Sequence, residues 1–429
     1  MKAPCPPPHP LARVPAPRTR PQKTPSPACW TISTVGDPRR PQGVHYPLAA
    51  VLAMVVCAMS GSGHDTATAA VEWAHRADDA LLMRLGLRFD PVTGRVPVPT
   101  ERTVADVLKH LDTHTIAAAG AAHAEAIAAC ARPAPARQTP DDVPEREHRR
   151  TLRRPAAAEG SRWIRLAADG KAMRGSRRSN GTRTGVFHLC RHSDGVITAA
   201  EPIGAKHTET AAFIRALDRL EAADCLITAD ALHTVKAHAS YLHRRGAHYL
   251  FYVKANRARL HERLARLPWR QVAWAHDEGW QRNRDRFERR RVKVLAADGL
   301  GLAFPHAAQV LLIERRTRRI GAARTAKTTV FAVTDLPAHK ARPAELADCL
   351  RGHWRVEAVH HIRDVTWRED ARRARTGMLP AVLGCLADIA RQALTAAGWA
   401  NLASGRRAHT DPDKALQLHR IPRISTSPP

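Results

Sequence analysis

Two aspartates stand where apolar strands are expected to reach the surface. Asp169 closes the stretch RWIRLAAD, and Asp230 follows the apolar residues of CLITAD. If the two strands are neighbours, the carboxylates converge, and like charges at short range are costly unless a cation neutralises them. Mg²⁺ prefers such hard oxygen ligands. The alternative is that each acid only forms a turn or caps a helix.

A third acid that could join them is Glu357. It lies in RGHWRVEAVHHIRDVTWRED, whose spacing places four polar groups on one helix face: His353, Glu357, His361 and Asp364. One interpretation is a metal site of three carboxylates. A second is a solvated charged face. A third is a zinc site formed by His353, Glu357 and either His360 or His361.

The elements that must position these acids alternate in a recognisable order. Strands are expected at 162–169, 184–192 and 195–203, and the pattern then alternates helix, strand, helix and strand up to YLFYVKAN. This order predicts an α/β fold in which helical crossovers extend a sheet that contains a hairpin. Residues 256–337 interrupt the rhythm with charged, β-prone segments, which predicts a β-rich insertion.

The remaining chain divides by composition. We expect a disordered Pro/Arg-rich tail at 1–32, a small helical domain at 33–130 with Thr100 as an N-cap, and a linker rich in proline and charge at 131–161. The α/β domain is predicted to occupy residues 162–404, and residues 405–429 to form a basic C-terminal tail. The run PLAAVLAMVVCAM is too short for a membrane helix and is predicted to be a buried helix.

The charge of the chain favours a polyanionic partner. With 68 Lys and Arg against 40 Asp and Glu, the formal net charge is +28. Nucleic acid is the commonest such partner, although a biased genome composition would also enrich arginine. Lys171, Arg174, Lys254 and Arg257 flank the acids and are candidates for phosphate contacts or ordinary surface charges. The eight cysteines form no CxxC pair, which is typical of reduced thiols in a cytosolic protein.

The segments ADGKAMRGS, ITADALHT followed by YLFYVKAN, and RGHWRVEAVHHIRDVTWREDARRAR together resemble the DDE-type insertion-sequence transposases of the ISAs subgroup, which includes the H-repeat-associated proteins. The resemblance extends from about Val35 to about Arg407. It departs from the family pattern beside the glutamate, where Ala358 and His361 replace an asparagine and a tryptophan, and at Thr208.

The resemblance implies an RNase H-like catalytic domain with a β-rich insertion, in which Asp169, Asp230 and Glu357 hold two Mg²⁺ or Mn²⁺ ions. It implies metal-dependent strand cleavage and transfer on double-stranded DNA, at the terminal repeats of an insertion sequence and at a target. A homodimer in the DNA complex, a prokaryotic cytoplasmic location at the nucleoid and no membrane association are further expectations. The alternatives are a catalytically silent DNA-binding protein derived from such a transposase and a zinc hydrolase.

The net charge generates a first prediction. Affinity for duplex DNA should fall steeply with salt, because the basic side chains displace condensed counterions; six to ten phosphate contacts correspond to a loss of roughly 10³- to 10⁵-fold between 50 and 200 mM salt. Fluorescence anisotropy on a labelled duplex across that range measures the slope. An affinity that does not change with salt would contradict the prediction.

Overall fold

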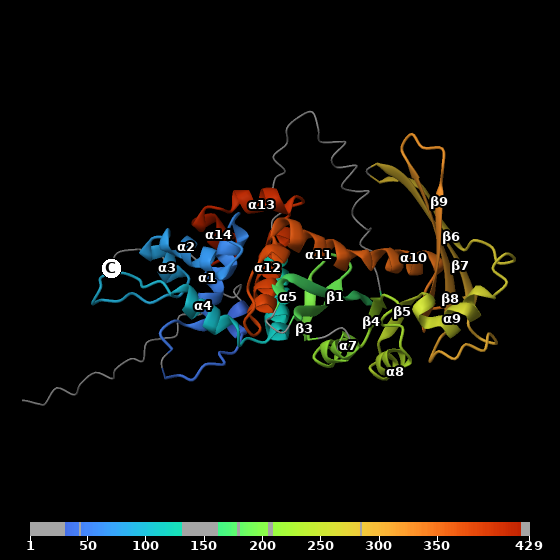
Figure 1. The fold of residues 1–429 in the computed structure, drawn as a ribbon, viewed down its shortest axis with the longest axis horizontal. Coiled ribbons are helices and arrows are strands. Elements are labelled where there is room, and N and C mark those ends of the chain that lie inside the picture. The colour runs from blue at the N-terminus through green and yellow to red at the C-terminus, as the bar shows by residue number, and fades with distance from the viewer. Residues whose placement is uncertain are drawn as a thin grey trace, which may run out of the picture.

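The structure is a computed structural model that describes residues 31–42, 44–130, 162–177, 181–204, 209–283 and 285–421. Residues 1–30 of the predicted tail and the predicted linker at 131–161 lie outside the described residues. The chain is elongated, with the N-terminal helices at one end, the first strands of the sheet in the middle and β6 to β9 at the other end (Figure 1).

The N-terminal region is helical. Its elements are η1 (Thr31–Thr34), α1 (Leu48–Ser60), α2 (Ala67–His75), α3 (Asp79–Arg84), α4 (Glu101–Leu108) and α5 (Thr113–Cys130). The expected cap is confirmed, because the Thr100 side chain accepts a hydrogen bond from the Thr103 backbone N–H. The apolar run forms α1, which is buried along almost its whole length. Among the described residues, no helix is long and apolar enough to span a membrane.

The predicted RNase H-like arrangement is confirmed in the central sheet. The elements are β1 (Ile164–Arg177), β2 (Arg183–Arg191), β3 (Ile197–Ile203), α7 (Glu209–Asp218), β4 (Cys225–Ala229), α8 (Lys236–Arg244) and β5 (His248–Val253). The strands lie in the order β3-β2-β1-β4-β5. Strands β1 to β3 are antiparallel, whereas β1, β4 and β5 are parallel and are joined through helices.

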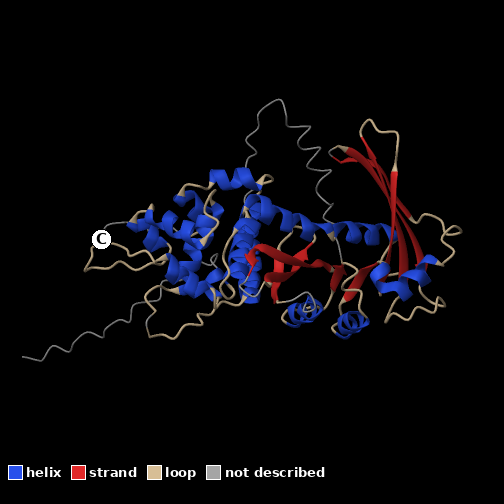
Figure 2. Cartoon of the chain, in the orientation of Figure 1, coloured by secondary structure: helices blue, strands red, loops and turns tan. Residues whose placement is uncertain are grey.

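The β-rich insertion continues this sheet instead of forming a separate one. After η3 (Ala255–Arg257) and α9 (Ala258–Ala265), the chain forms β6 (His276–Asn283), β7 (Arg286–Ala296), β8 (Gln309–Arg319) and β9 (Ala326–Thr334). Strand β9 pairs with β5 in antiparallel register, from Leu250 opposite Thr334 to Val253 opposite Phe331. One nine-stranded sheet results, and its far strands curve away from the central helices (Figures 1 and 2).

Helices cover both faces of the central strands. The C-terminal elements are α10 (Pro343–Gly352), α11 (Trp354–Thr366), η4 (Glu369–Ala371), α12 (Leu379–Ala396), α13 (Leu402–Ala408) and α14 (Pro412–Leu418). Helix α11 packs on β1 and β2, whereas α7 packs on β2 and β3 from the opposite face (Figure 2). Helix α12 packs against both α5 and α1, so the N-terminal and C-terminal helices share one hydrophobic core.

The predicted basic tail at 405–429 needs correction. Its residues up to 421 complete α13, form α14 and bury Leu416, Leu418 and Ile421 in the core shared with α1. Composition was misleading here because Arg406, one of the charges that suggested a tail, is itself buried. Its guanidinium donates to Asp65 and to the carbonyl oxygens of Gly61 and Thr366.

A buried ionic cluster joins α11 to its surroundings. The Arg363 side chain is 1% exposed and is held by two carboxylates: Nε donates to Glu369 at 3.0 Å and Nη1 donates to Asp388 at 2.8 Å. Asp388 also accepts from Arg391 at 3.0 Å. Although burial opposes ionisation of Glu369, the neighbouring Arg363 lowers the pKa of this carboxyl below its ordinary value. The cluster is therefore charged and mutually compensated.

Removing one member of this cluster should strongly lower the stability of the fold. Asp388→Ala leaves Arg363 and Arg391 buried with less compensation, and breaking a buried pair in this way costs about 3–5 kcal/mol of the free energy of unfolding. Urea unfolding followed by circular dichroism measures the change. The matched control is Asp106→Ala, which removes an exposed partner of Lys109 and should leave the unfolding midpoint nearly unchanged. Equal midpoints for the two variants would contradict the role assigned to the cluster.

Candidate active site

The two predicted aspartates emerge side by side from neighbouring strands. Strands β1 and β4 pair in parallel, and the last pair in their register is Ala168 with Ala229. Asp169 and Asp230 each follow that pair directly. Because the strands run in the same direction, the two carboxylates belong to the same edge of the ladder. The expectation that these strands are neighbours is met.

The two acids nevertheless differ in their local structure. The prediction that the first strand ends at Asp169 is wrong, because β1 continues to Arg177. Its outer half pairs only with β2, so Asp169 lies at the point where β4 leaves the sheet. Asp230 does end its strand. Its Oδ1 accepts a hydrogen bond from the Leu232 backbone N–H at 2.8 Å, so this carboxylate also forms the turn that was its simpler interpretation.

The turn after Asp230 is held in place from the neighbouring strand. Beyond β5, Asn256 donates to the Ala231 carbonyl oxygen at 3.0 Å, and Arg257 donates to the Leu232 carbonyl oxygen at 2.6 Å. Arg257 was a candidate for a phosphate contact. Instead it stabilises the backbone that carries the second aspartate.

Glu357 lies on α11 within electrostatic reach of both aspartates. Burial and the negative charges of Asp169 and Asp230 raise the pKa of the Glu357 carboxyl, while the nearby Lys254 ammonium opposes this effect. Glu357 is an exposed residue, and the Asp169 side chain is 27% exposed. Three carboxylates around one accessible region, with the pKa of Glu357 raised in part by the charges of the two aspartates, are a donor set of the type that suits a divalent cation with oxygen ligands.

The basic residues near the acids do not form one group. Lys171 is buried, and its ammonium donates to both oxygens of Asp364 at 2.7 and 2.8 Å, so its charge is used in the core. The Arg174 side chain is 79% exposed, with its guanidinium 3.5 Å from Asp370. Lys254 is exposed at the end of β5. Arg174 and Lys254 therefore remain accessible to a ligand.

The histidines that could have formed a zinc site are dispersed. His353 is buried and contacts the Thr228 hydroxyl at 3.2 Å, and burial lowers the pKa of its ring. His360 is also buried and contacts His188 at 3.0 Å, whereas His361 is exposed. Within the described ranges, no three His, Cys, Asp or Glu side chains are close enough to hold a metal ion in this conformation, and this applies to Asp169, Asp230 and Glu357 as well as to the histidines. The structure gives the zinc interpretation no support.

Two groups near Asp169 were not assigned from the sequence. His188 lies opposite Asp169 in the β1–β2 register and is fully buried. On the other face of β1, the Glu209 carboxylate lies so close to Gly170 that an added Cβ would meet it at 2.6 Å, and this carboxylate is 3.3 Å from the buried His233 ring. His188 lies on β2, which contains no Asp or Glu, so its sequence gives no indication of a site. Glu209 is separated from the first aspartate by two strands, so its proximity depends on the register.

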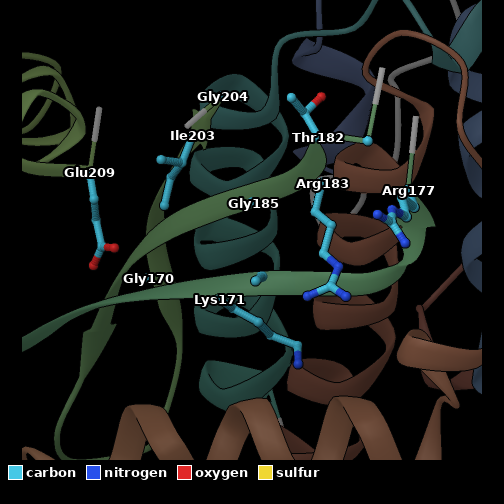
Figure 3. Close-up of a pocket in the computed structure, with 11 residues that line it drawn as sticks. Gly170, Lys171, Arg177, Thr182, Arg183, Gly185, Ile203, Gly204 and Glu209 are labelled. Atoms are coloured by element: carbon cyan, nitrogen blue, oxygen red, sulfur yellow. The ribbon is translucent and has the colours of Figure 1, made fainter. Parts of the chain in front are cut away.

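A hollow of about 550 Å³ opens beside Glu209. Figure 3 shows Arg177 and Arg183 at one end of it and Glu209 at the other. It is lined by the β1–β2 hairpin, the end of β3 and the start of α7, through Gly170, Lys171, Ala172, Arg177, Gly181, Thr182, Arg183, Gly185, Ile203, Gly204 and Glu209. Gly170 and Lys171, which follow Asp169 on β1, line the hollow, but none of the three predicted ligands does.

Comparisons with known proteins identify two family matches. The family described as Transposase DDE domain matches residues 149–377, and the one described as DDE_Tnp_1-associated matches residues 30–124. A curated relative, "Putative transposase YncI" of Escherichia coli O157:H7, is 25% identical over 227 residues, which cover 49% of this chain and 57% of the relative.

A solved structure, the piggyBac transposase synaptic complex with hairpin DNA, is 9% identical at a TM-score of 0.33, over 62% of this chain and 55% of that one. The chain thus spans a little over half the length of each of these two relatives. The Transposase DDE domain match covers more than half of the chain and includes all three predicted acids. The chain belongs to the transposase DDE domain family.

Proposed function

We propose that this protein is a DNA transposase that cleaves and transfers DNA strands at the ends of an insertion sequence. In this proposal Asp169, Asp230 and Glu357 bind two Mg²⁺ or Mn²⁺ ions. The observation that carries it is the parallel register of β1 and β4, which ends at Ala168 and Ala229 and leaves one aspartate on each strand beside the other. A third carboxylate, Glu357 on α11, lies within electrostatic reach of both, and a cation would neutralise this concentration of negative charge.

The three acids have different tasks in this site. Asp169 is anchored within a continuous strand and provides a fixed ligand. Asp230 uses Oδ1 for its own turn and has Oδ2 left to bind a cation. Glu357 comes from a helix and can complete the site by moving its longer side chain. Bound there, the two ions would activate a water or a DNA 3′-hydroxyl and stabilise the departing oxygen during phosphoryl transfer.

Double-stranded DNA is the partner that the charge distribution supports. Arg174 and Lys254 are accessible near the acids and are the proposed phosphate contacts there. The distal strands add positive charge. Glu288 is 3% exposed and contacts Arg286, Arg290 and Arg315.

On the same strands, Glu314 engages three basic side chains, Arg291, Arg316 and Lys327. Each of these two carboxylates neutralises only part of the charge around it, so the distal sheet carries a positive excess that suits a phosphate backbone. We further propose a homodimer on DNA, because joining the two ends of an element requires that both be held together.

The second candidate function is a DNA-binding protein that has lost catalysis. The residues beside Glu357 that differ from the family pattern, Ala358 and His361, are the reason to consider it. Both are exposed, so they leave the fold unaffected, but both lie close to the proposed ligand. Activity and DNA binding must therefore be measured separately.

Removing any acid of the site should abolish catalysis and spare DNA binding. Asp169→Asn, Asp230→Asn and Glu357→Gln should each lower the rate of strand cleavage by on the order of 10³-fold or more, since metal stabilisation of the transition state amounts to several kcal/mol. DNA affinity should stay equal or rise slightly because one repulsive charge is gone. Cleavage is measured in Mg²⁺ and in Mn²⁺ on a duplex with the inverted repeats that flank the gene, and by nicking of supercoiled plasmid.

The matched control is Glu262→Gln, which removes an exposed carboxylate on α9 away from the site. It should cleave like the parent. Undiminished cleavage by the Asp169 or Asp230 variant would overturn the mechanism. A parent that binds the repeats but cleaves neither substrate would favour the silent DNA-binding protein.

A further inference from the structure

Behind Asp169 lies a chain of buried polar groups that the proposed function does not use. The Nδ1 atom of His360 is 3.5 Å from Oδ2 of Asp169, and its Nε2 is 3.0 Å from Nδ1 of His188. On the far side, Nε2 of His188 is 2.9 Å from Nη1 of Arg363. This series of side-chain contacts therefore leads from the fully buried guanidinium of Arg363 to the Asp169 carboxylate at the edge of the site.

The fold explains why these groups meet. Asp169 and His188 are direct partners in the antiparallel β1–β2 ladder, so their side chains leave the sheet on the same face. Helix α11 packs on that face and carries His360 and Arg363 three residues apart, which places both on its inner side. His360 thus fills the space between the two strand residues.

The direction of these hydrogen bonds follows from Arg363, the donor at the buried end of the series. A guanidinium has only donors, so Nε2 of His188 must accept from Arg363. Burial and the charge of Arg363 lower the pKa of His188 well below its ordinary value, which keeps the ring neutral with its single hydrogen on Nδ1. That hydrogen is donated to Nε2 of His360. With Nε2 occupied as an acceptor, His360 carries its hydrogen on Nδ1, which faces Asp169.

The Arg363 guanidinium, from which this series of contacts starts, is itself held in place. Arg363 is bound through Nε and Nη2 by Glu369 and through Nη1 by Asp388, which in turn accepts from Arg391. The guanidinium therefore cannot turn away from His188 without breaking buried charged hydrogen bonds. The orientation of the His188 ring, and through it that of the His360 ring, therefore depends on this ionic cluster.

We propose that His360 is a positioning residue that presents its Nδ1–H to Asp169 and holds the carboxylate toward Asp230. This inference rests on the proposed function, because it assigns Asp169 as a metal ligand. The separation of 3.5 Å is a few tenths of an ångström longer than an ordinary hydrogen bond, and such contacts commonly tighten when the site is filled. A group that orients a metal ligand in this way typically contributes about 10- to 100-fold in metal affinity.

A role in packing alone makes a different prediction, because His360 also fills space beneath α11. The two roles are separated by His360→Leu, which fills the space without a donor, and His360→Asn, whose amide nitrogen can take the place of Nδ1. Val365→Ala is the matched control on the same helix, since that residue is exposed and has no role in the proposed site. Asp169→Asn provides the reference for a lost ligand.

The experiment is a Mn²⁺ titration of the full chain without DNA, followed by electron paramagnetic resonance, together with thermal unfolding and plasmid nicking. We expect His360→Leu to weaken Mn²⁺ binding by about 10- to 100-fold, His360→Asn to recover most of it, and Val365→Ala to match the parent. Recovery by asparagine is the result that a packing role cannot give, because asparagine fills the space less well than leucine.

Parent-like Mn²⁺ binding by His360→Leu would overturn the inference while leaving the proposed function standing. So would leucine and asparagine variants that are equally weak. A parent that neither binds Mn²⁺ nor nicks DNA would overturn both. As an independent readout, long-range proton–nitrogen spectra of histidine-labelled protein should show His188 and His360 protonated at Nδ1, and protonation of His188 at Nε2 would contradict the chain of donors.

Discussion

The buried guanidinium of Arg363 is the interaction on which the placement of α11 depends. It contacts β2 through His188, α12 through Asp388 and the segment after α11 through Glu369. A charge with no access to water is tolerated only when its partners are held at hydrogen-bonding distance, so this cluster fixes both the rotation and the depth of the helix. Glu357 belongs to the same helix, and its reach toward the aspartates is set by that position.

The sheet supplies the complementary constraint. The register of the parallel pair β1 and β4 determines which residues become neighbours at the end of β4. A slip of one residue would turn one aspartate to the opposite face of the sheet. The site therefore depends on two separate registers, one between strands and one between helix and sheet. The pKa of Glu357 responds to both, because burial on α11 and the two aspartates all raise it.

Sequence reasoning found the features that follow from local patterns. Apolar runs that end in an aspartate predicted the strands and their acids, and helical spacing placed Glu357. Features that depend on partners distant in the sequence were missed or misjudged. The pairing of Lys171 with Asp364 removes a predicted phosphate contact, and no local pattern distinguishes a buried lysine on a strand from an exposed one.

The same reason accounts for the errors of extent. Strand β1 continues past Asp169 because β2 still pairs with it, and the length of that hairpin cannot be seen from β1 alone. The basic composition of the C-terminal residues predicts a tail, but Arg406 pairs with Asp65, which lies more than three hundred residues earlier in the sequence. Likewise, the sequence of the distal strands predicts an inserted subdomain, whereas the pairing of β9 with β5 makes them part of the same sheet.

The packing of α1 against α12 and α14 has a consequence for how the protein is made. Helix α1 is apolar on nearly every side, and although α2 covers part of it, the other two helices that bury it follow more than three hundred residues later in the sequence. During translation its surface must stay covered by a chaperone or by temporary contacts until residues 379–418 have emerged from the ribosome, and closing so distant a contact is slow. A ribosome that stalls before residue 379 would release a chain in which α1 lacks both α12 and α14, so a truncated chain of this kind exposes much of an apolar helix.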